Sequence, residues 1–295
     1  MTEGKRSECT SVSQYTEWLK KAYEKEENVF YRGQSNTKYN LKPSVLRDDK
    51  RVNCENLIYV KVLSECSNDF SMDMSHITIL SKMQHYGVPT RLLDITTNAL
   101  VALYFACDDV RNEDKDGVVF AFYPSEESVK TFDSDTISIL SSIPRFTKQE
   151  KDSLKKTASE YSKRLQSEDE GLKDKNIREF NSDILVKRLL HEVKSEKPAF
   201  ENIINPLHLL RNYFIIPKKD NPRIIRQSGA FIMVGLQNTI DPERVKIRKI
   251  IIPCAYKHKI LKELESLGIS KITLHPELYK MAEYITESFL DNIEI

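Results

Sequence analysis

The sequence predicts a mixed α+β protein with a split central sheet, flanking helices and a charged helical insertion. Helical and strand patterns alternate through the first 124 residues. Residues 125–212 are instead dense in Lys, Glu, Asp and Ser, with few apolar residues before "ILVKRLLHEV". Strand-forming segments then return in "GAFIMVG" and "VKIRKIIIP". We therefore expect one interrupted domain over residues 1–295, in which residues 125–212 form a helical insertion or lid.

The elements of the first third follow from local patterns. A helix is predicted over residues 12–23, where apolar residues share one face and Ser11 with Gln14 offers a capping box. "VFYRGQ", residues 29–34, is typical of a short strand. Apolar residues at helical spacing predict two further helices, over residues 58–70 and 76–86, the second of which ends at Gly87.

Later elements carry similar signals. Pro89 favours an extended stretch, "TRLLDIT", before a buried helix that Asn98 could cap. "VVFAFYP" is a β-prone segment, and Thr147 with Glu150 forms a capping box before a helix over residues 151–165. Near the end, "KHKILKELESLG" predicts a helix that ends at Gly268. "KITL" predicts a short strand, and Pro276 the start of a last helix.

Composition narrows the class of protein. Forty-five basic and 44 acidic residues leave a net charge of +1, which argues against a general polyanion-binding surface but leaves room for a local basic cleft. Five scattered cysteines without a C-x-x-C pair predict free thiols in a reducing compartment. The polar start of the chain and the lack of a long apolar run predict a cytoplasmic protein with no membrane partner.

Standard catalytic motifs are missing from the sequence. It contains no G-x-G-x-x-G, Walker A or G-x-S-x-G pattern, and its six histidines lie far apart. We therefore expect no metal site. A nuclease is disfavoured as well, because Asp108 and Asp109 fall at the frayed end of a helix, where a metal pair would be poorly held.

The segment "FYRGQ" is the first of three unusual polar groupings. Strand alternation puts Phe30 and Arg32 on one face and Tyr31 on the other. A guanidinium that points toward the interior needs a carboxylate or a phosphate, because leaving it unpaired is costly. Gly33, which has no side chain, would let a ligand approach the backbone beside it.

The other two groupings lie further along the chain. In "QHYGVPTRLLDIT", Asp94 and Thr96 share a strand face just before a helix whose positive N-terminal end favours a nearby anion. In "NPRIIRQSGAF", Arg226 and Gln227 lead into a strand through Gly229.

These segments resemble the FRG-domain family, which is named after its F/Y-R-G motif. The resemblance rests on "FYRGQ", "LSKMQHYGVPTRLLDITTNALVALYFAC", "NPRIIRQSGAFIMVG" and the tail "IIIP…KHKILKELESLGI…LHPEL". It spans nearly the whole chain apart from the charged insertion. One departure is Ile95, which stands where the family tends to have tryptophan. The family name by itself implies no reaction.

A second resemblance is to arginine-type ADP-ribosyltransferases. Arg32 is similar to the arginine of their first strand, and Asp94-x-Thr96 stands where their S-x-S motif would be. At the third element Gln227 matches the first position, but Gly229 replaces the catalytic glutamate. The resemblance implies NAD as the substrate, and it implies that another carboxylate must stabilise the oxocarbenium-like transition state.

Asp94 is the nearest such carboxylate, and with Arg32 and Gln227 it forms the predicted catalytic set. Arg32 would hold the pyrophosphate or a ribose hydroxyl. Gln34 and Gln227 would orient ribose hydroxyls. His85 or Tyr86 would stack on a ring of the ligand or form a hydrogen bond with it. The predicted nucleotide-binding residues are Tyr31, Gly33, Gln34, His85, Tyr86, Thr90, Arg91 and Thr96.

Several alternatives stay open at this point. Arg32 and Asp94 could pair with each other across adjacent strands, Arg91 could cover a sheet edge, and Gln227 could cap a buried backbone group. The protein is either an NAD-cleaving enzyme, with a protein, a nucleic acid or water as acceptor, or a module that binds a nucleotide or nucleic acid without chemistry. A role in stress or phage defence would fit an NAD-consuming protein, although no residue pattern points to it directly. The oligomeric state is left open.

Overall fold

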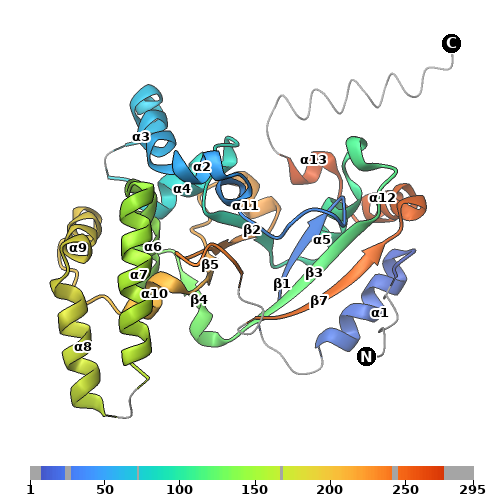
Figure 1. Cartoon of the computed structure of the whole chain (residues 1–295). Coiled ribbons are helices and arrows are strands. Elements are labelled where there is room, and N and C mark those ends of the chain that lie inside the picture. Colours follow the sequence, from blue (N-terminus) through green and yellow to red (C-terminus); the bar gives the residue numbers. More distant parts are fainter. Residues whose placement is uncertain (1–7, 24–27, 72, 167–168, 241–244, 276–295) are drawn as a thin grey trace.

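A seven-stranded sheet forms the centre of the computed structural model, which describes residues 8–23, 28–71, 73–166, 169–240 and 245–275 (Figure 1). The strand order is β4-β5-β6-β2-β1-β3-β7. Neighbouring strands are antiparallel except β4 and β5, which are parallel. The strands are β1 (Phe30–Gln34), β2 (Leu92–Thr96), β3 (Gly117–Pro124), β4 (Val129–Thr131), β5 (Tyr213–Ile216), β6 (Gly229–Met233) and β7 (Val245–Ile252).

Helices flank this sheet, so the predicted mixed α+β class is confirmed. The helices are α1 (Val12–Tyr23), α2 (Asp49–Asn53), α3 (Glu55–Glu65), α4 (His76–His85), α5 (Ala99–Cys107), α6 (Asp135–Ser142), α7 (Lys148–Arg164), α8 (Glu170–Ser182), α9 (Ile184–Glu196), α10 (Pro206–Leu210), α11 (Pro222–Arg226), α12 (Lys257–Ser266) and α13 (Lys271–Leu274). We call α6–α10, residues 135–210, the helical unit.

Local capping signals mark several helix ends correctly. The Asn98 side chain accepts hydrogen bonds from two backbone N–H groups at the start of α5, and the capping box of Thr147 and Glu150 is present at α7. Gly87 and Gly268 both have positive φ just beyond the ends of α4 and α12. These four predictions from sequence are confirmed.

The segment "KITL" was predicted as a strand, and that prediction is wrong. Residues Lys271–Leu274 form α13, because Ser270 caps the turn and Thr273 bonds back to the backbone of Ser270. Among the elements that no local pattern predicted are β4, which has three residues, and β5, which has four. Another is α6, which is buried around most of its circumference, so that its helical period is hidden. The predicted helix that begins at Pro276 lies outside the described residues.

One face of β1, β3 and β7 packs against α1, α5 and α12 (Figure 1). This core includes Tyr31 from β1, Val119 from β3 and Ile252 from β7, all buried. The other face of the sheet buries Phe30, Leu93 and other side chains in a separate core. Alternation along β1 therefore sends Tyr31 toward α5 and Phe30 to the opposite side, as the strand pattern predicted.

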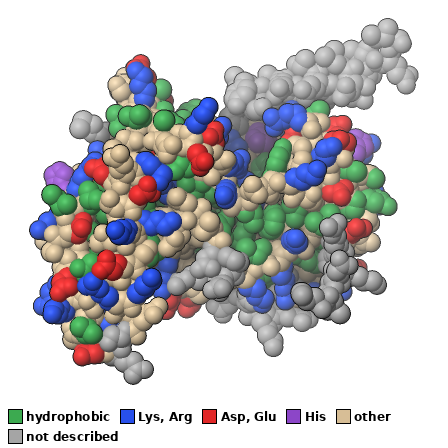
Figure 2. All heavy atoms as spheres, viewed as in Figure 1, with side chains coloured by type: hydrophobic (Ala, Val, Ile, Leu, Met, Phe, Trp, Pro, Cys, Tyr) green, Lys and Arg blue, Asp and Glu red, His purple; other side chains and the backbone are tan. Residues whose placement is uncertain are grey.

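The helical unit packs with α3 and α4 over β2, β5 and β6 in a third core, on the left in Figure 1. A buried ion cluster joins these parts. Glu55, at the start of α3, accepts hydrogen bonds from Arg91, which precedes β2, and from Lys151 of α7. All three residues are at most 3 % exposed. Basic and acidic side chains are interspersed over the visible face of the helical unit (Figure 2).

Of the helices that the structure describes, none is both long enough and apolar enough to cross a bilayer.

Candidate functional site

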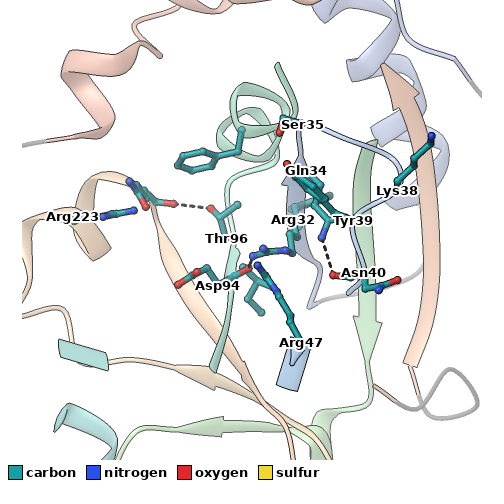
Figure 3. A pocket seen from close by; sticks show the side chains of 15 residues that line it. Arg32, Gln34, Ser35, Lys38, Tyr39, Asn40, Arg47, Asp94, Thr96 and Arg223 are labelled. Carbon is teal, nitrogen blue, oxygen red and sulfur yellow. Dashed lines mark hydrogen bonds between the residues drawn. The ribbon is translucent and has the colours of Figure 1, made fainter. Parts of the chain in front are cut away.

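The centre of the sheet opens where β1 and β2 separate. The two strands are registered through one residue pair, Tyr31 with Thr96. Beyond that pair, the Arg32 side chain spans the gap and donates through Nη1 to the backbone carbonyl of Asp94 (Figure 3). A cavity of about 510 Å³ lies beside this contact, and its lining includes Arg32, Asp94 and Gln227. The fold therefore brings the three predicted catalytic residues to one cavity.

Arg32 is half-buried and incompletely bonded within the described part of the chain. Its Nε is buried without a hydrogen-bond partner there. Burial lowers the pKa of Arg32, the Asp94 charge opposes that shift, and Arg47 adds to it. Because Arg32 contacts the main-chain oxygen of Asp94, its remaining N–H groups are left for another acceptor.

Gln34 adds a second incompletely bonded group to the same wall. Its side chain is 5 % exposed, and within the described residues its Oε1 has no partner. The Nε2 donates over a long 3.5 Å to the backbone oxygen of Asn40. A buried amide oxygen without a donor is costly, so a ligand hydroxyl or amide in this position would gain a hydrogen bond.

The charged residues that line the cavity are mainly cationic. Arg32, Arg47, Arg223 and Lys38 contribute positive charge, and Asp94 is the one carboxylate among the described lining residues. In Figure 3 the side chains of Arg32, Arg47 and Asp94 converge, whereas Lys38 points away from them. Such a set favours an anion with several oxygen atoms, because arginine forks match phosphate geometry.

Asp94 is exposed and held from the side of α4. Its Oδ2 accepts from Gln84 Nε2 at 2.9 Å, and Gln84 Oε1 accepts from the Thr90 hydroxyl at 2.6 Å. Thr90 is buried and lies outside the cavity, so this predicted ligand residue contacts Gln84 and not the cavity. This chain of two hydrogen bonds fixes the direction of the carboxylate.

Gln227 and Thr96 line the cavity but are also engaged in local structure. Gln227 Nε2 donates to the Leu274 carbonyl at 3.0 Å. The Thr96 hydroxyl donates to the Gln227 carbonyl at 2.7 Å and accepts from the backbone N–H of Asn98 at 2.9 Å. The first N–H groups of α5 bond the Asn98 side chain, so the expected anion-attracting end of this helix is already capped.

Gly33 lines the cavity, and its lack of a side chain is required for helix packing. A Cβ atom at this position would lie 1.8 Å from the backbone oxygen of Ala102 in α5. The glycine therefore lets α5 lie directly on β1, which is a different reason from the ligand approach that the sequence predicted. Tyr31 also borders the cavity, although most of its side chain is buried against α5.

Arg91 lies outside the cavity. Its Nε and Nη2 donate to the two oxygens of Glu55 at 2.6 and 2.8 Å, and its Nη1 donates to Asn238 Oδ1 at 3.0 Å. Burial alone would raise the pKa of Glu55, but the adjacent Arg91 and Lys151 outweigh it and hold that pKa below its ordinary value. The cluster is a structural link.

His85 and Tyr86 lie at the far side of Asp94. Both line a second cavity, of about 460 Å³, and Tyr86 is 66 % exposed. They therefore do not share the arginine-lined cavity with the other predicted ligand residues.

Sequence reasoning missed Arg47, Tyr39 and Arg223 as lining residues. Arg47 and Tyr39 follow the "FYRGQ" strand in a loop and short turn, where no periodicity marks a side chain as facing a cavity. Arg223 lies in "NPRIIRQ", a segment that was singled out, so its own motif was a signal for it.

Comparison with known families supports the motif analysis. The family model of the FRG domain matches residues 27–115, which is less than half of the chain. No curated protein and no solved structure matches the chain. The matched range holds Arg32, Gln34, Arg47 and Asp94 but not the "RQSGAF" segment or the C-terminal tail, for which the resemblance stays a prediction. Residues 27–115 of this chain are thus an FRG domain, as the F/Y-R-G motif predicted.

Proposed function

We propose that the protein binds NAD in the arginine-lined cavity and cleaves the bond between nicotinamide and ribose. The observation that carries this proposal is that Arg32, Arg47 and Arg223 line one cavity together with the exposed carboxylate of Asp94. The cationic side chains would bind a pyrophosphate, and the carboxylate would stabilise the positive charge that develops on the ribose. The volume of about 510 Å³ falls within the roughly 300–1,000 Å³ that is typical of small-molecule sites.

Under this proposal, the cationic residues bind the ligand and the carboxylate acts on the bond that breaks. Arg32 and Arg47 would bind the pyrophosphate oxygens, and Gln34 would bond a ribose hydroxyl through its unpartnered oxygen. As the C1′–N bond breaks, nicotinamide leaves with the bonding electron pair and positive charge develops on the ribose. The Asp94 carboxylate, oriented by Gln84, would stabilise that charge and accept the proton of the attacking acceptor.

A second candidate is a binding module that holds the nucleotide without cleaving it. Gly229 stands where ADP-ribosyltransferases have their glutamate, and the Gln227 amide donates to the Leu274 carbonyl. Under this reading the arginines bind the same anion and Asp94 only sets the shape of the cavity. The likeness to ADP-ribosyltransferases, and a role in stress or phage defence, belong to the first candidate alone.

The test combines nicotinamide release with calorimetry on the full chain. Wild type is expected to bind NAD and to release nicotinamide. Asp94→Asn is expected to bind NAD with similar affinity and to release nicotinamide about 10²–10³-fold more slowly, which is the usual loss when one electrostatic contact to a transition state is removed. Binding without turnover in wild type would favour the second candidate. The absence of binding by any nucleotide would contradict both.

A further inference from the structure

A second cavity, of about 460 Å³, lies between α4 and the segment that follows β5. Most of its wall is apolar, and its polar lining includes Lys82, Lys218 and Asp220. The apolar side chains come from Met74, Ile77, Phe132, Pro217, Pro222 and Phe231. Cavities of this kind, mainly apolar with a few polar groups, are typical of small-molecule sites.

A third cavity, of about 70 Å³, lies between the two larger ones and shares walls with both. It shares Asp94 and Gln227 with the arginine-lined cavity. It shares Ser81 and His85 with the apolar cavity. Gln84, which holds the Asp94 carboxylate, also lines it. Asp94 therefore stands at the boundary between a cationic and an apolar site.

The sizes indicate two ligands and not one. Each large cavity has the volume of a complete small-molecule site, for which about 300–1,000 Å³ is usual. The connecting cavity holds only a small group, since a water molecule occupies about 30 Å³ in the liquid. A hydroxyl or amino group fits such a space, whereas a nucleoside does not. These shared walls would let one molecule approach Asp94 from the apolar side while another fills the cationic side.

We propose that the apolar cavity is the acceptor site of the reaction, and that it takes an aromatic ring carrying a hydroxyl group. This inference rests on the proposed cleavage of NAD. The hydroxyl oxygen would attack C1′ as the C1′–N bond breaks, its proton would pass to the Asp94 carboxylate, and nicotinamide would leave with the bonding pair. The products are nicotinamide and an aryl ADP-riboside, with no oxidant or reductant needed.

The lining of the apolar cavity favours an aromatic acceptor. Phe132 and Phe231 offer aromatic contacts to a flat ring, while Ile77 provides an aliphatic wall. The polar Ser81 and His85 lie toward the connecting cavity, where the hydroxyl would be. An aliphatic sugar or another hydrophilic acceptor would leave these apolar walls uncovered. Both a free phenol and a tyrosine side chain carry the required group.

The experiment measures how cleaved NAD is divided between water and the acceptor. The full chain is incubated with NAD and either p-cresol or a short tyrosine-containing peptide, and products are separated by chromatography and identified by mass. We expect an aryl ADP-riboside whose share rises with acceptor concentration. A product from p-cresol assigns the site to free phenols, and one from the peptide alone assigns it to tyrosine side chains.

Thr78→Trp would fill the apolar cavity from α4, where the Thr78 side chain lines the wall. The ratio of transfer to hydrolysis is expected to fall by at least roughly tenfold, because the ring then loses its apolar contacts. The matched control is Ser153→Trp, an exposed position on α7 that lines none of the three cavities, and it should leave the ratio unchanged.

Two failures are distinguishable. If wild type releases no nicotinamide under any condition, the proposed cleavage is wrong and the acceptor site with it. If nicotinamide is released but neither probe is modified, or Thr78→Trp leaves the ratio as in wild type, then the acceptor assignment alone is overturned and hydrolysis stands.

Discussion

Arg32 and Arg91 are two arginines at the centre of the molecule that have opposite environments. Arg91 is 1 % exposed and its fork is met by both oxygens of Glu55. Arg32 is half-buried, bonds a main-chain oxygen, and keeps a buried Nε without a partner among the described residues. One guanidinium is neutralised within the protein, and the other faces a cavity of about 510 Å³.

The difference separates a cation that is compensated within the protein from one that we propose binds a ligand. Burying a charge costs several kcal/mol unless a partner compensates for it. Glu55 supplies that compensation to Arg91 and Lys151, and so helps to hold α7 against the rest of the protein. Arg32 has no equivalent ion pair to a described carboxylate, and we propose that a bound anion supplies the compensation. The following predictions are ordered from the largest effect to the smallest.

Glu55→Gln is expected to lower the free energy of unfolding by about 3–5 kcal/mol, because it leaves two buried cations without their carboxylate. Chemical denaturation of the purified protein measures this loss. The matched control is Glu65→Gln on the same helix, where an exposed ion pair with Lys61 is broken at a cost below about 1 kcal/mol. A similar small loss at Glu55 would mean that the cluster does not hold the helical unit in place.

Arg32→Ala is expected to weaken NAD binding by roughly 10–100-fold, because charge-assisted hydrogen bonds are each worth about 1.5–3 kcal/mol. The free energy of unfolding should change by less than about 1 kcal/mol, since the incompletely bonded cation contributes little to stability. Calorimetric titration and denaturation measure the two effects. The control is Arg226→Ala, which removes an exposed arginine outside the cavity and should leave binding intact.

If Arg32→Ala instead unfolds the protein, the comparison with Arg91 fails, and Arg32 is a structural residue like Arg91.

The pH dependence of stability offers the smallest and most local test. Burial lowers the pKa of His76, with Glu196 opposing that shift and Arg145 adding to it. The unfolded chain therefore binds a proton more readily than the folded one, and stability should fall as the pH drops below about 6.5. Glu55 acts in a lower window: its depressed pKa stabilises the fold above about pH 4.5, and this contribution is lost on further acidification.

Denaturation at pH 7.5 and 5.5 tests the first window. His76→Gln should reduce the difference between the two values, whereas an unchanged difference would assign the acid sensitivity to other groups, such as His208, whose pKa burial also lowers.

Much of the fold could be predicted from short-range signals. Asn98, Gly87 and the Thr147–Glu150 pair mark helix ends through bonds to their own neighbours, so the sequence alone contains both partners. The strand β5 and the helix α6 escaped prediction because tertiary packing, and not periodicity, determines which of their residues are buried. Short apolar segments of this kind are ambiguous without their neighbours in space.

The site was predictable only in part, for a related reason. Arg32, Asp94 and Gln227 stood out because their motifs are unusual, and the cavity joins all three. Arg91 is a structural residue because it pairs with Glu55, which lies 36 residues earlier in the chain and belongs to no motif. Arg47 reaches the cavity from a turn whose position follows from the whole fold. Long-range pairing of this kind leaves no trace in local spacing.

The strand order has a practical consequence for anyone who wishes to isolate the segment that the family model matches. The FRG match ends at residue 115, yet β1 lies between β2 and β3, and β3 begins at Gly117. In a fragment that ends at this boundary, β1 would be an unpaired edge strand and therefore prone to aggregation. Glu55 would also lose its ion pair with Lys151. A recombinant fragment should therefore keep the entire sheet, because the sheet extends well beyond the residues that the family model matches.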